Sequence, residues 1–307
     1  MSVLSNYAAK LAHRVSYVWA IQTQKSADVS DNGCTDSQGR RGGGTRPLSA
    51  WGRSAVDLSA GAIVLLTVAG FVAGAINAAA GGGSLVSFPA LVVLGYPPLI
   101  ANVTNNVAVA PGYLTGAVGY RRGLSSQRRR ILPLAIASIA GSLVGVALIL
   151  ASSQKAFEGV VPLLVLAACI MLAAQPTVAR WLGQRSGARD RPGSGALAAL
   201  TLVAVYGGYF SAALGVAILA VLGIFFEDTL QRLNALKALL QLLIGVVSAL
   251  GYALVTPVDW TAVGIIAPAG LVGGEVGARL AQKVSDRVLR VCIVVYGVAA
   301  AIWLFVR

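Results

Sequence analysis

Two glycine-rich motifs interrupt long apolar stretches of this 307-residue sequence. The first motif reads Gly74-Ala-Ile-Asn77-Ala-Ala-Ala-Gly81-Gly82-Gly83-Ser84. Each glycine costs a helix interior about 1 kcal/mol relative to alanine, so three in succession predict a break in the helix. In hydrocarbon, the freed backbone groups must be satisfied by protein or by a polar cavity. An N-terminal helix end at such a break attracts anions through its free N–H groups and its dipole. Close helix packing through small residues is the alternative interpretation.

A second motif, Tyr206-Gly207-Gly208-Tyr209 followed by Ser211, occupies the corresponding place in the second part of the chain. We expect Ser84 to be the N-cap of the helix that follows the first break, because serine is a preferred capping residue. The first group of predicted substrate-binding residues is therefore Asn77, Gly81, Gly82, Gly83 and Ser84.

Further polar side chains gather at two related places in the apolar sequence. Asn102, Thr104, Asn105 and Asn106 stand at the entrance to one apolar segment, whereas Asn234, Lys237 and Gln241 stand in another. The latter three are spaced by three and four residues, so they share one face of a helix. Lys237 either extends to the lipid head groups or points inward and supplies positive charge to an anion. We add Asn102, Thr104, Asn105, Asn234, Lys237 and Gln241 to the predicted substrate-binding residues.

The elements that position these residues are predicted to be membrane helices. The chain is 57% hydrophobic and only 11% charged, whereas soluble domains carry about 25% charged residues. Apolar segments lie at 58–79, 84–94, 101–120, 131–151, 158–178, 196–225, 233–254, 260–281 and 288–306. A membrane span needs about 20 apolar residues. Two regions do not fit one straight helix each, because 58–94 is too long and 196–225 is broken by glycines. We predict an all-α integral membrane protein with about eight transmembrane segments.

One constant shift along the chain superposes its second part on its first. The shift places Gly83 on Gly215, Asn102 on Asn234, Gly119-Tyr120 on Gly251-Tyr252, Gly141 on Gly273, Gly145 on Gly277 and Ser153 on Ser285. We predict two homologous membrane repeats, 58–180 and 196–307, joined by a polar linker at 181–195. Residues 1–57 are a polar N-terminal extension that we expect to be disordered. Such internal symmetry is the usual ground plan of secondary transporters.

The direction of the repeats depends on how the two over-long regions are counted. If each is a hairpin of two shorter helices that returns to its own side, each half has three crossings and the repeats are inverted. The basic clusters Arg121–Arg130, Arg180–Arg191, Arg232 and Arg279–Arg290 then all face the cytoplasm, and the loops 95–100, 152–157 and 255–259 face outside. Counting each region as one crossing gives parallel halves with the last basic cluster outside. The positive-inside rule favours inverted repeats.

Several classes of protein are disfavoured by the residues that are present. His13 is the single histidine, and Cys34, Cys169 and Cys292 lack the spacing of metal ligands. We therefore expect no metal and no cofactor. The sequence also has no carboxylate pair in its apolar segments, no HExxH and no P-loop, so we expect no catalytic residues and no enzyme. The net charge of +13 fits basic loops against anionic lipid head groups better than nucleic-acid binding.

These motifs resemble those of the sulfite exporter TauE/SafE family of bacterial membrane proteins. The resemblance covers residues 60–306 and rests on Gly74…Asn77…Gly81-Gly82-Gly83-Ser84…Pro89, Gly95-Tyr-Pro, Ala101-Asn102-Val-Thr104-Asn105, Tyr206-Gly-Gly-Tyr209…Gly215, Asn234-Ala-Leu-Lys237 and Gly273-Gly274…Gly277-Ala-Arg279-Leu. It implies a multi-pass permease of the bacterial inner membrane that exports sulfite, sulfoacetate or related organosulfonates.

We predict a secondary transporter whose partners are a small anionic substrate and the lipid bilayer. An anion channel and a non-transporting assembly or sensor subunit are the alternatives. The sequence leaves open whether the protein is a monomer or a homo-oligomer.

Overall fold

A computed structural model describes residues 59–79, 81–120, 123–124, 127–182, 192–280 and 286–306. Its helices are α2 (Ala60–Ala79), α3 (Ser84–Val93), α4 (Pro98–Gly119), α5 (Arg128–Ala151), α6 (Gln154–Leu182), α7 (Ser194–Tyr209), α8 (Leu214–Phe225), α9 (Leu230–Val255), α10 (Trp260–Leu280) and α11 (Asp286–Val306). The predicted extension at 1–57 and residues 183–191 of the predicted linker lie outside the described residues. Throughout the described ranges the chain is helical or in loops, which confirms the all-α prediction.

The outer faces of these helices are apolar, as a lipid environment requires. Leu202, Leu254 and Phe305 expose 70%, 72% and 77% of their surface. Within the described ranges, α2, α5, α6, α9 and α10 are long and apolar enough to cross a membrane, by length and composition. The predicted total of about eight crossings is therefore matched only in part by this criterion.

The first over-long region is broken at its glycine-rich motif, as predicted. The second is broken just after its motif, because Gly207 and Gly208 lie within α7 and the break falls at residues 210–213, so the prediction that these glycines break the helix is wrong in position. The first region forms α2 and the ten-residue α3, and the second forms α7 and α8, of 16 and 12 residues. The helix pair in each region is in contact. One detail differs from the expected pair of short helices, because α2 has 20 residues and is itself long enough to span a bilayer.

The positions of the helices recur with the offset found in the sequence, the one that carries Gly83 onto Gly215. Helices α9, α10 and α11 begin at this same offset after α4, α5 and α6, respectively. The starts of α7 and α8, compared with those of α2 and α3, differ from this spacing by only two residues. The order of two helices around a break followed by three long helices is therefore present twice.

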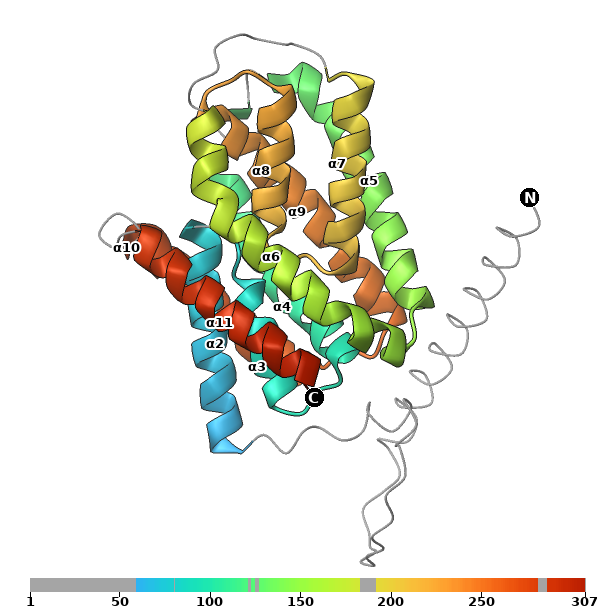
Figure 1. Ribbon diagram of the computed structural model, residues 1–307, viewed down its shortest axis with the longest axis vertical. Helices are drawn as coiled ribbons and strands as arrows, with labels where there is room; N and C mark the ends of the chain where they lie inside the picture. Colours follow the sequence, from blue (N-terminus) through green and yellow to red (C-terminus); the bar gives the residue numbers. More distant parts are fainter. Residues whose placement is uncertain are drawn as a thin grey trace, which may run out of the picture.

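One helix from each half of the chain packs against helices of the other half. Helix α10 packs along α2 and against α4, whereas α5 packs along α7 and against α9. Figure 1 shows α5, α7, α8 and α9 gathered at one end of the molecule and α2 and α3 at the other. Helices α4 and α9 contact each other across the middle, as do α6 and α11. Each packed group thus contains residues of both predicted halves.

Glycines let α10 and α5 approach their partner helices closely. A Cβ atom added to Gly74 of α2 would lie 2.0 Å from the carbonyl oxygen of Gly270 in α10. A Cβ atom on Gly145 of α5 would likewise lie 2.2 Å from the carbonyl oxygen of Val205 in α7. Both distances are impossible for a real side chain. Small residues at these crossings are what membrane helices use to pack, since lipid supplies no hydrophobic drive for association.

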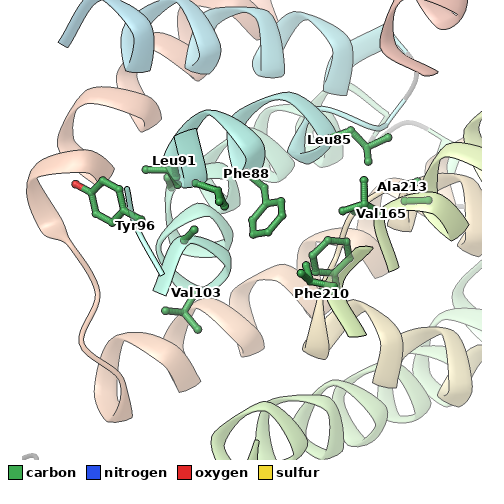
Figure 2. Packing of buried hydrophobic residues seen from close by; sticks show 14 of the residues in the cluster. Leu85, Phe88, Leu91, Tyr96, Val103, Val165, Phe210 and Ala213 are labelled. Atoms are coloured by element: carbon green, nitrogen blue, oxygen red, sulfur yellow. The ribbon is translucent and has the colours of Figure 1, made fainter. Parts of the chain in front are cut away.

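Aromatic and aliphatic side chains fill the space beside the two breaks. The rings of Phe88 in α3 and Phe210, the residue after α7, meet edge to face with centroids 5.4 Å apart. Figure 2 shows the two rings next to each other, with Val165 of α6 and Ala213 near Phe210. This apolar packing joins the first broken region to the second.

Candidate functional site

The first break lies between α2 and α3 and depends on glycine. Gly81 has a φ of +78°, a left-handed conformation that glycine adopts without steric cost. Its N–H donates to the carbonyl oxygens of Ile76 and Asn77, at 3.2 Å each, and so ends α2. A Cβ atom on Gly83 would lie 2.0 Å from the carbonyl oxygen of Ala73, because the start of α3 rests on the last turns of α2.

The prediction that Ser84 caps α3 is wrong. Gly83 is the N-cap residue, with the helical angles φ −57° and ψ −34°, and no side chain caps this end. A serine N-cap requires an extended backbone at the capping position, which the close contact of Gly83 with α2 does not allow. Ser84 is instead the first residue of α3, and its side chain is buried at 5% exposure.

The second break is built without a glycine at its bends. Ser211 and Ala213 have φ values of +62° and +53°, which are unfavourable for residues with a Cβ atom. The offset that relates the halves carries Gly81 onto Ala213, so equivalent positions share the left-handed conformation. Two tyrosine hydroxyls form hydrogen bonds beside this bend. Tyr206 donates to the carbonyl oxygen of Ala212 at 2.6 Å, and Tyr252 donates to the carbonyl oxygen of Gly208.

The two breaks lie against each other. A Cβ atom on Gly81 would be 3.6 Å from Cα of Gly215, at the start of α8. Asn102 of α4 donates its side-chain amide to the carbonyl oxygen of Tyr209, the last residue of α7, at 2.9 Å. An asparagine from the first half therefore satisfies a helix end in the second half, as buried backbone groups require.

The polar side chains at the start of α4 are all buried. Asn105 accepts the Ser87 hydroxyl at 2.5 Å, and Asn106 donates to the Asn102 carbonyl oxygen at 3.2 Å. Thr104 accepts the backbone N–H of Asp259 at 3.2 Å. The side-chain N–H₂ of Asn105 has no partner among the described residues, although the residue is only 1% exposed. A buried amide donor of this kind is available to a bound acceptor.

Helix α9 contributes the cationic residue. Gln241 is buried, and its side-chain oxygen would lie 2.8 Å from a Cβ atom on Gly215. Gln241 therefore covers the first turn of α8. Lys237 lies one helical turn before Gln241 on the same face, and Asn234 lies about one turn before Lys237. Lys237 and Asn234 are half-buried, and neither forms a hydrogen bond or ion pair with another described residue.

The structure thus brings part of the predicted site together. Gly81, Gly82, Gly83, Ser84, Asn102 and Gln241 surround the contact between the breaks, with Thr104 and Asn105 in the adjoining turn of α4. Asn77 contributes its carbonyl oxygen to the end of α2, and its side chain is half-buried. No hydrogen bond or ion pair joins Asn234 or Lys237 to the breaks within the described ranges. Helix geometry alone places them beside Gln241.

Tyr113 is a central residue that sequence reasoning did not identify. It lies in α4, is 5% exposed, and its hydroxyl faces the side chains of Ser84, Ser211 and Gln241. Its ring packs on α9, where a Cβ atom on Gly245 would lie 2.4 Å from a ring carbon. A tyrosine in an apolar segment carries no sequence signal for this position. Only the packing of α4 on α9 reveals it.

Two polar contacts join the halves at opposite ends of the helices. At one end, Tyr96 donates its hydroxyl to the Asp259 carboxylate at 2.8 Å. Burial and this hydrogen bond raise the pKa of the Tyr96 phenol above its ordinary value. At the other end, Arg130 pairs with Asp228 at 2.7 Å, and both side chains are nearly buried. The offset between the halves carries Tyr96 onto Asp228, so the two contacts use equivalent loops.

Carboxylate, histidine and cysteine groups do not gather in the part of this region that the structure describes. No group of three or more such side chains within the described ranges could hold a metal ion. The donors around the breaks are hydroxyls, amides and backbone N–H groups, which suit an anion.

Comparisons with known proteins agree with these features. The model of the family described as sulfite exporter TauE/SafE matches residues 66–304. A protein of Sinorhizobium named probable membrane transporter protein ORF9 is 28% identical over 251 residues, which cover 80% of this chain and 93% of that protein. A probable membrane transporter protein of Haemophilus influenzae is 34% identical over 112 residues, 36% of this chain and 44% of that protein. No solved structure matches the chain significantly.

Proposed function

We propose that this chain, which belongs to the sulfite exporter TauE/SafE family, exports a small anion such as sulfite, sulfoacetate or another organosulfonate. The family match and the names of its relatives identify it as a multi-pass membrane transporter. The substrate and the location in a bacterial inner membrane are the finer parts of the proposal. They follow the family description and the donors around the breaks.

The contact between the two breaks is the observation that carries the proposal. Each break ends one helix and begins another inside apolar sequence, and Gly81 of one approaches Gly215 of the other. Broken helices that meet inside a membrane protein are typical of substrate sites in secondary transporters. Their N-terminal ends favour negative charge, and the Asn105 amide and Lys237 add donors from α4 and α9.

We further propose two inverted repeats with about eight membrane segments in all. The contacts at the two ends support this arrangement. Tyr96 and Asp259 belong to loops that the inverted topology places outside, whereas Arg130 and Asp228 belong to regions that it places in the cytoplasm. Parallel repeats would put the two partners of each pair on opposite sides of the bilayer, so the pairs favour inversion.

Alternating access follows from the same pairs in this proposal. Each pair connects a loop of one half to the start of α5 or α10 in the other half. Release of the Tyr96–Asp259 pair would free the outer end, and release of the Arg130–Asp228 pair would free the cytoplasmic end. Opening the two ends in turn exposes the site at the breaks to one side at a time.

Reconstitution into liposomes tests the proposal. Purified protein should move radiolabelled sulfite or sulfoacetate at a rate that saturates with concentration, and protein-free liposomes should not. Flux that never saturates would point to a channel. Absence of flux for sulfite, sulfoacetate and other sulfonates under every imposed gradient would contradict transport of these anions.

A further inference from the structure

A cluster of buried hydroxyl and amide groups at the breaks extends beyond the residues that the sequence singles out. The Tyr113 hydroxyl faces Ser84 at the start of α3, Ser211 in the second break and Gln241 in α9. These four side chains come from both halves of the chain. Each is at most 6% exposed. Residues far apart in sequence therefore direct uncharged polar groups to one place.

One of these groups is unsatisfied. The Ser211 hydroxyl lies near that of Tyr113 but has no partner in hydrogen-bond geometry within the described part of the chain, although the residue is only 3% exposed. Leaving a buried hydroxyl unpaired costs about 1–3 kcal/mol. The residue also holds the left-handed φ of +62°, a backbone conformation that serine rarely adopts. Such strain and such an unpaired group concentrate at functional sites.

We infer that Tyr113, Ser211, Ser84 and Gln241 form the subsite that holds the oxygen atoms of the transported anion. This inference rests on the proposed function and assigns a chemical class to its substrate. Hydroxyl hydrogens rotate toward an acceptor, and the glutamine amide supplies two further donors. Four donor side chains offer more partners to a group with three oxygens, such as sulfite or a sulfonate, than a carboxylate with two can use.

The uncharged character of these four groups has a consequence for export. Uncharged donors bind an anion less tightly than an ion pair would, because charge-assisted bonds between two ions are stronger. The anion can therefore leave when the site opens. Lys237 lies one turn before Gln241 on the same face of α9 and would supply positive charge on that side of the subsite.

Kinetics of sulfite transport in proteoliposomes test the inference. Tyr113→Phe keeps the ring that packs on Gly245 and removes only the hydroxyl, and Ser211→Ala removes the unpaired hydroxyl. We expect each variant to raise the KM for sulfite about tenfold, the effect of losing one hydrogen bond to a charged ligand. Ser138→Ala is the matched control, because the Ser138 hydroxyl of α5 is also buried and unpaired among the described residues. It should leave the KM unchanged.

A binding measurement covers variants that fold but do not transport. Sulfite should raise the melting temperature of the wild type and of Ser138→Ala in detergent, and acetate should do so less. The shift should shrink in Tyr113→Phe and Ser211→Ala. Wild-type flux with an unchanged KM and an unchanged thermal shift in both variants would overturn the subsite and leave the proposed function standing. Lack of anion flux in the wild type would overturn the proposed function and the subsite together.

Discussion

Asn102 donates its side-chain amide to the carbonyl oxygen of Tyr209 at 2.9 Å, across the boundary between the halves. This bond connects the polar start of α4 to the end of α7, where the second break begins. It satisfies a carbonyl group that has no partner within its own helix. The second break is therefore joined to α4 of the first half by a side chain, and to the first break by the approach of Gly81 to Gly215.

We expect Asn102→Ala to destabilise the protein by about 1–3 kcal/mol, because the buried Tyr209 carbonyl would lose its partner. The melting temperature in detergent measures this effect. Asn106→Ala is the control, since the Asn106 amide bonds to Asn102 in its own helix and to no other described residue, and its effect should be less than half as large. Equal effects of the two substitutions would contradict a special role for the bond between the halves.

Gly83 is expected to tolerate no side chain. Gly83→Ala places a methyl group 2.0 Å from the Ala73 carbonyl oxygen, so α3 must move away from α2. We predict loss of monodisperse protein in size-exclusion chromatography after membrane extraction. Gly116→Ala in α4 has open space around the new methyl group, and the protein should remain folded. A well-folded Gly83→Ala variant would show that the first break does not need this close approach.

Lys237 is predicted to favour transport at the expense of stability. It is half-buried and has no partner among the described residues, and burying an unpaired charge is unfavourable. Lys237→Gln should therefore keep or raise the melting temperature while it raises the KM for sulfite about tenfold, the cost of losing an ionic donor. The exposed Lys155 of α6 provides the control Lys155→Gln. Wild-type kinetics in Lys237→Gln would instead support a lysine that only extends to the head groups.

The ion pair between Arg130 and Asp228 is expected to stabilise the end at which it lies. Both side chains are 6% exposed or less, and the Arg130 guanidinium lies 5.3 Å from the centre of the Phe226 ring. Breaking such a buried pair costs about 3–5 kcal/mol, so Asp228→Asn should lower the melting temperature strongly.

Arg232 offers an internal comparison for this pair. Its side chain is 49% exposed, and its guanidinium lies 3.4 Å from the same Asp228 carboxylate. An exposed pair contributes about 0–1 kcal/mol, so Arg232→Gln should change the melting temperature little. A larger loss in Arg232→Gln than in Asp228→Asn would contradict the assignment of the stabilising contact to Arg130.

The Tyr96–Asp259 contact predicts that the stability of the folded protein falls at alkaline pH. The pKa of Tyr96 is raised in the folded protein, so the folded state retains this proton more strongly than the unfolded state. The contribution is complete below the ordinary tyrosine pKa of about 10 and is lost as the pH rises above it. The wild type should lose melting temperature more steeply above about pH 10 than Tyr96→Phe. The exposed Tyr120 supplies the control Tyr120→Phe, which should follow the wild type. Parallel curves for Tyr96→Phe and wild type would count against this contact.

Local sequence chemistry was sufficient for the first break, whereas the second falls after the glycines that were expected to cause it. Three glycines at 81–83 have a predictable effect on any helix, and the first break falls there. The constant offset between the halves can be read from matching residues such as Asn102 and Asn234, and α4 and α9, which contain them, begin at the same offset. The resemblance to the TauE/SafE family was likewise confirmed by the family match.

Tertiary packing decided what the sequence did not predict. The packing of α5 and α10 against helices of the other half depends on which glycines face each other, and no periodicity encodes that choice. Tyr113 and Asp259 act through partners in other helices and loops that are distant in the chain. The capping role expected for Ser84 failed because contact with α2 holds Gly83 in a helical conformation. The predicted domain boundaries, and the roles of the predicted site residues, stay predictions.

Sulfite counterflow in proteoliposomes tests the central claim most directly. Liposomes loaded with unlabelled sulfite are diluted into a trace of radiolabelled sulfite, and the label inside is followed over time. A transporter that alternates access around one site between the breaks should accumulate label transiently above equilibrium, and Tyr113→Phe should reduce that overshoot while Ser138→Ala keeps it. Label that only approaches equilibrium, or an equal overshoot in all three proteins, would contradict the account.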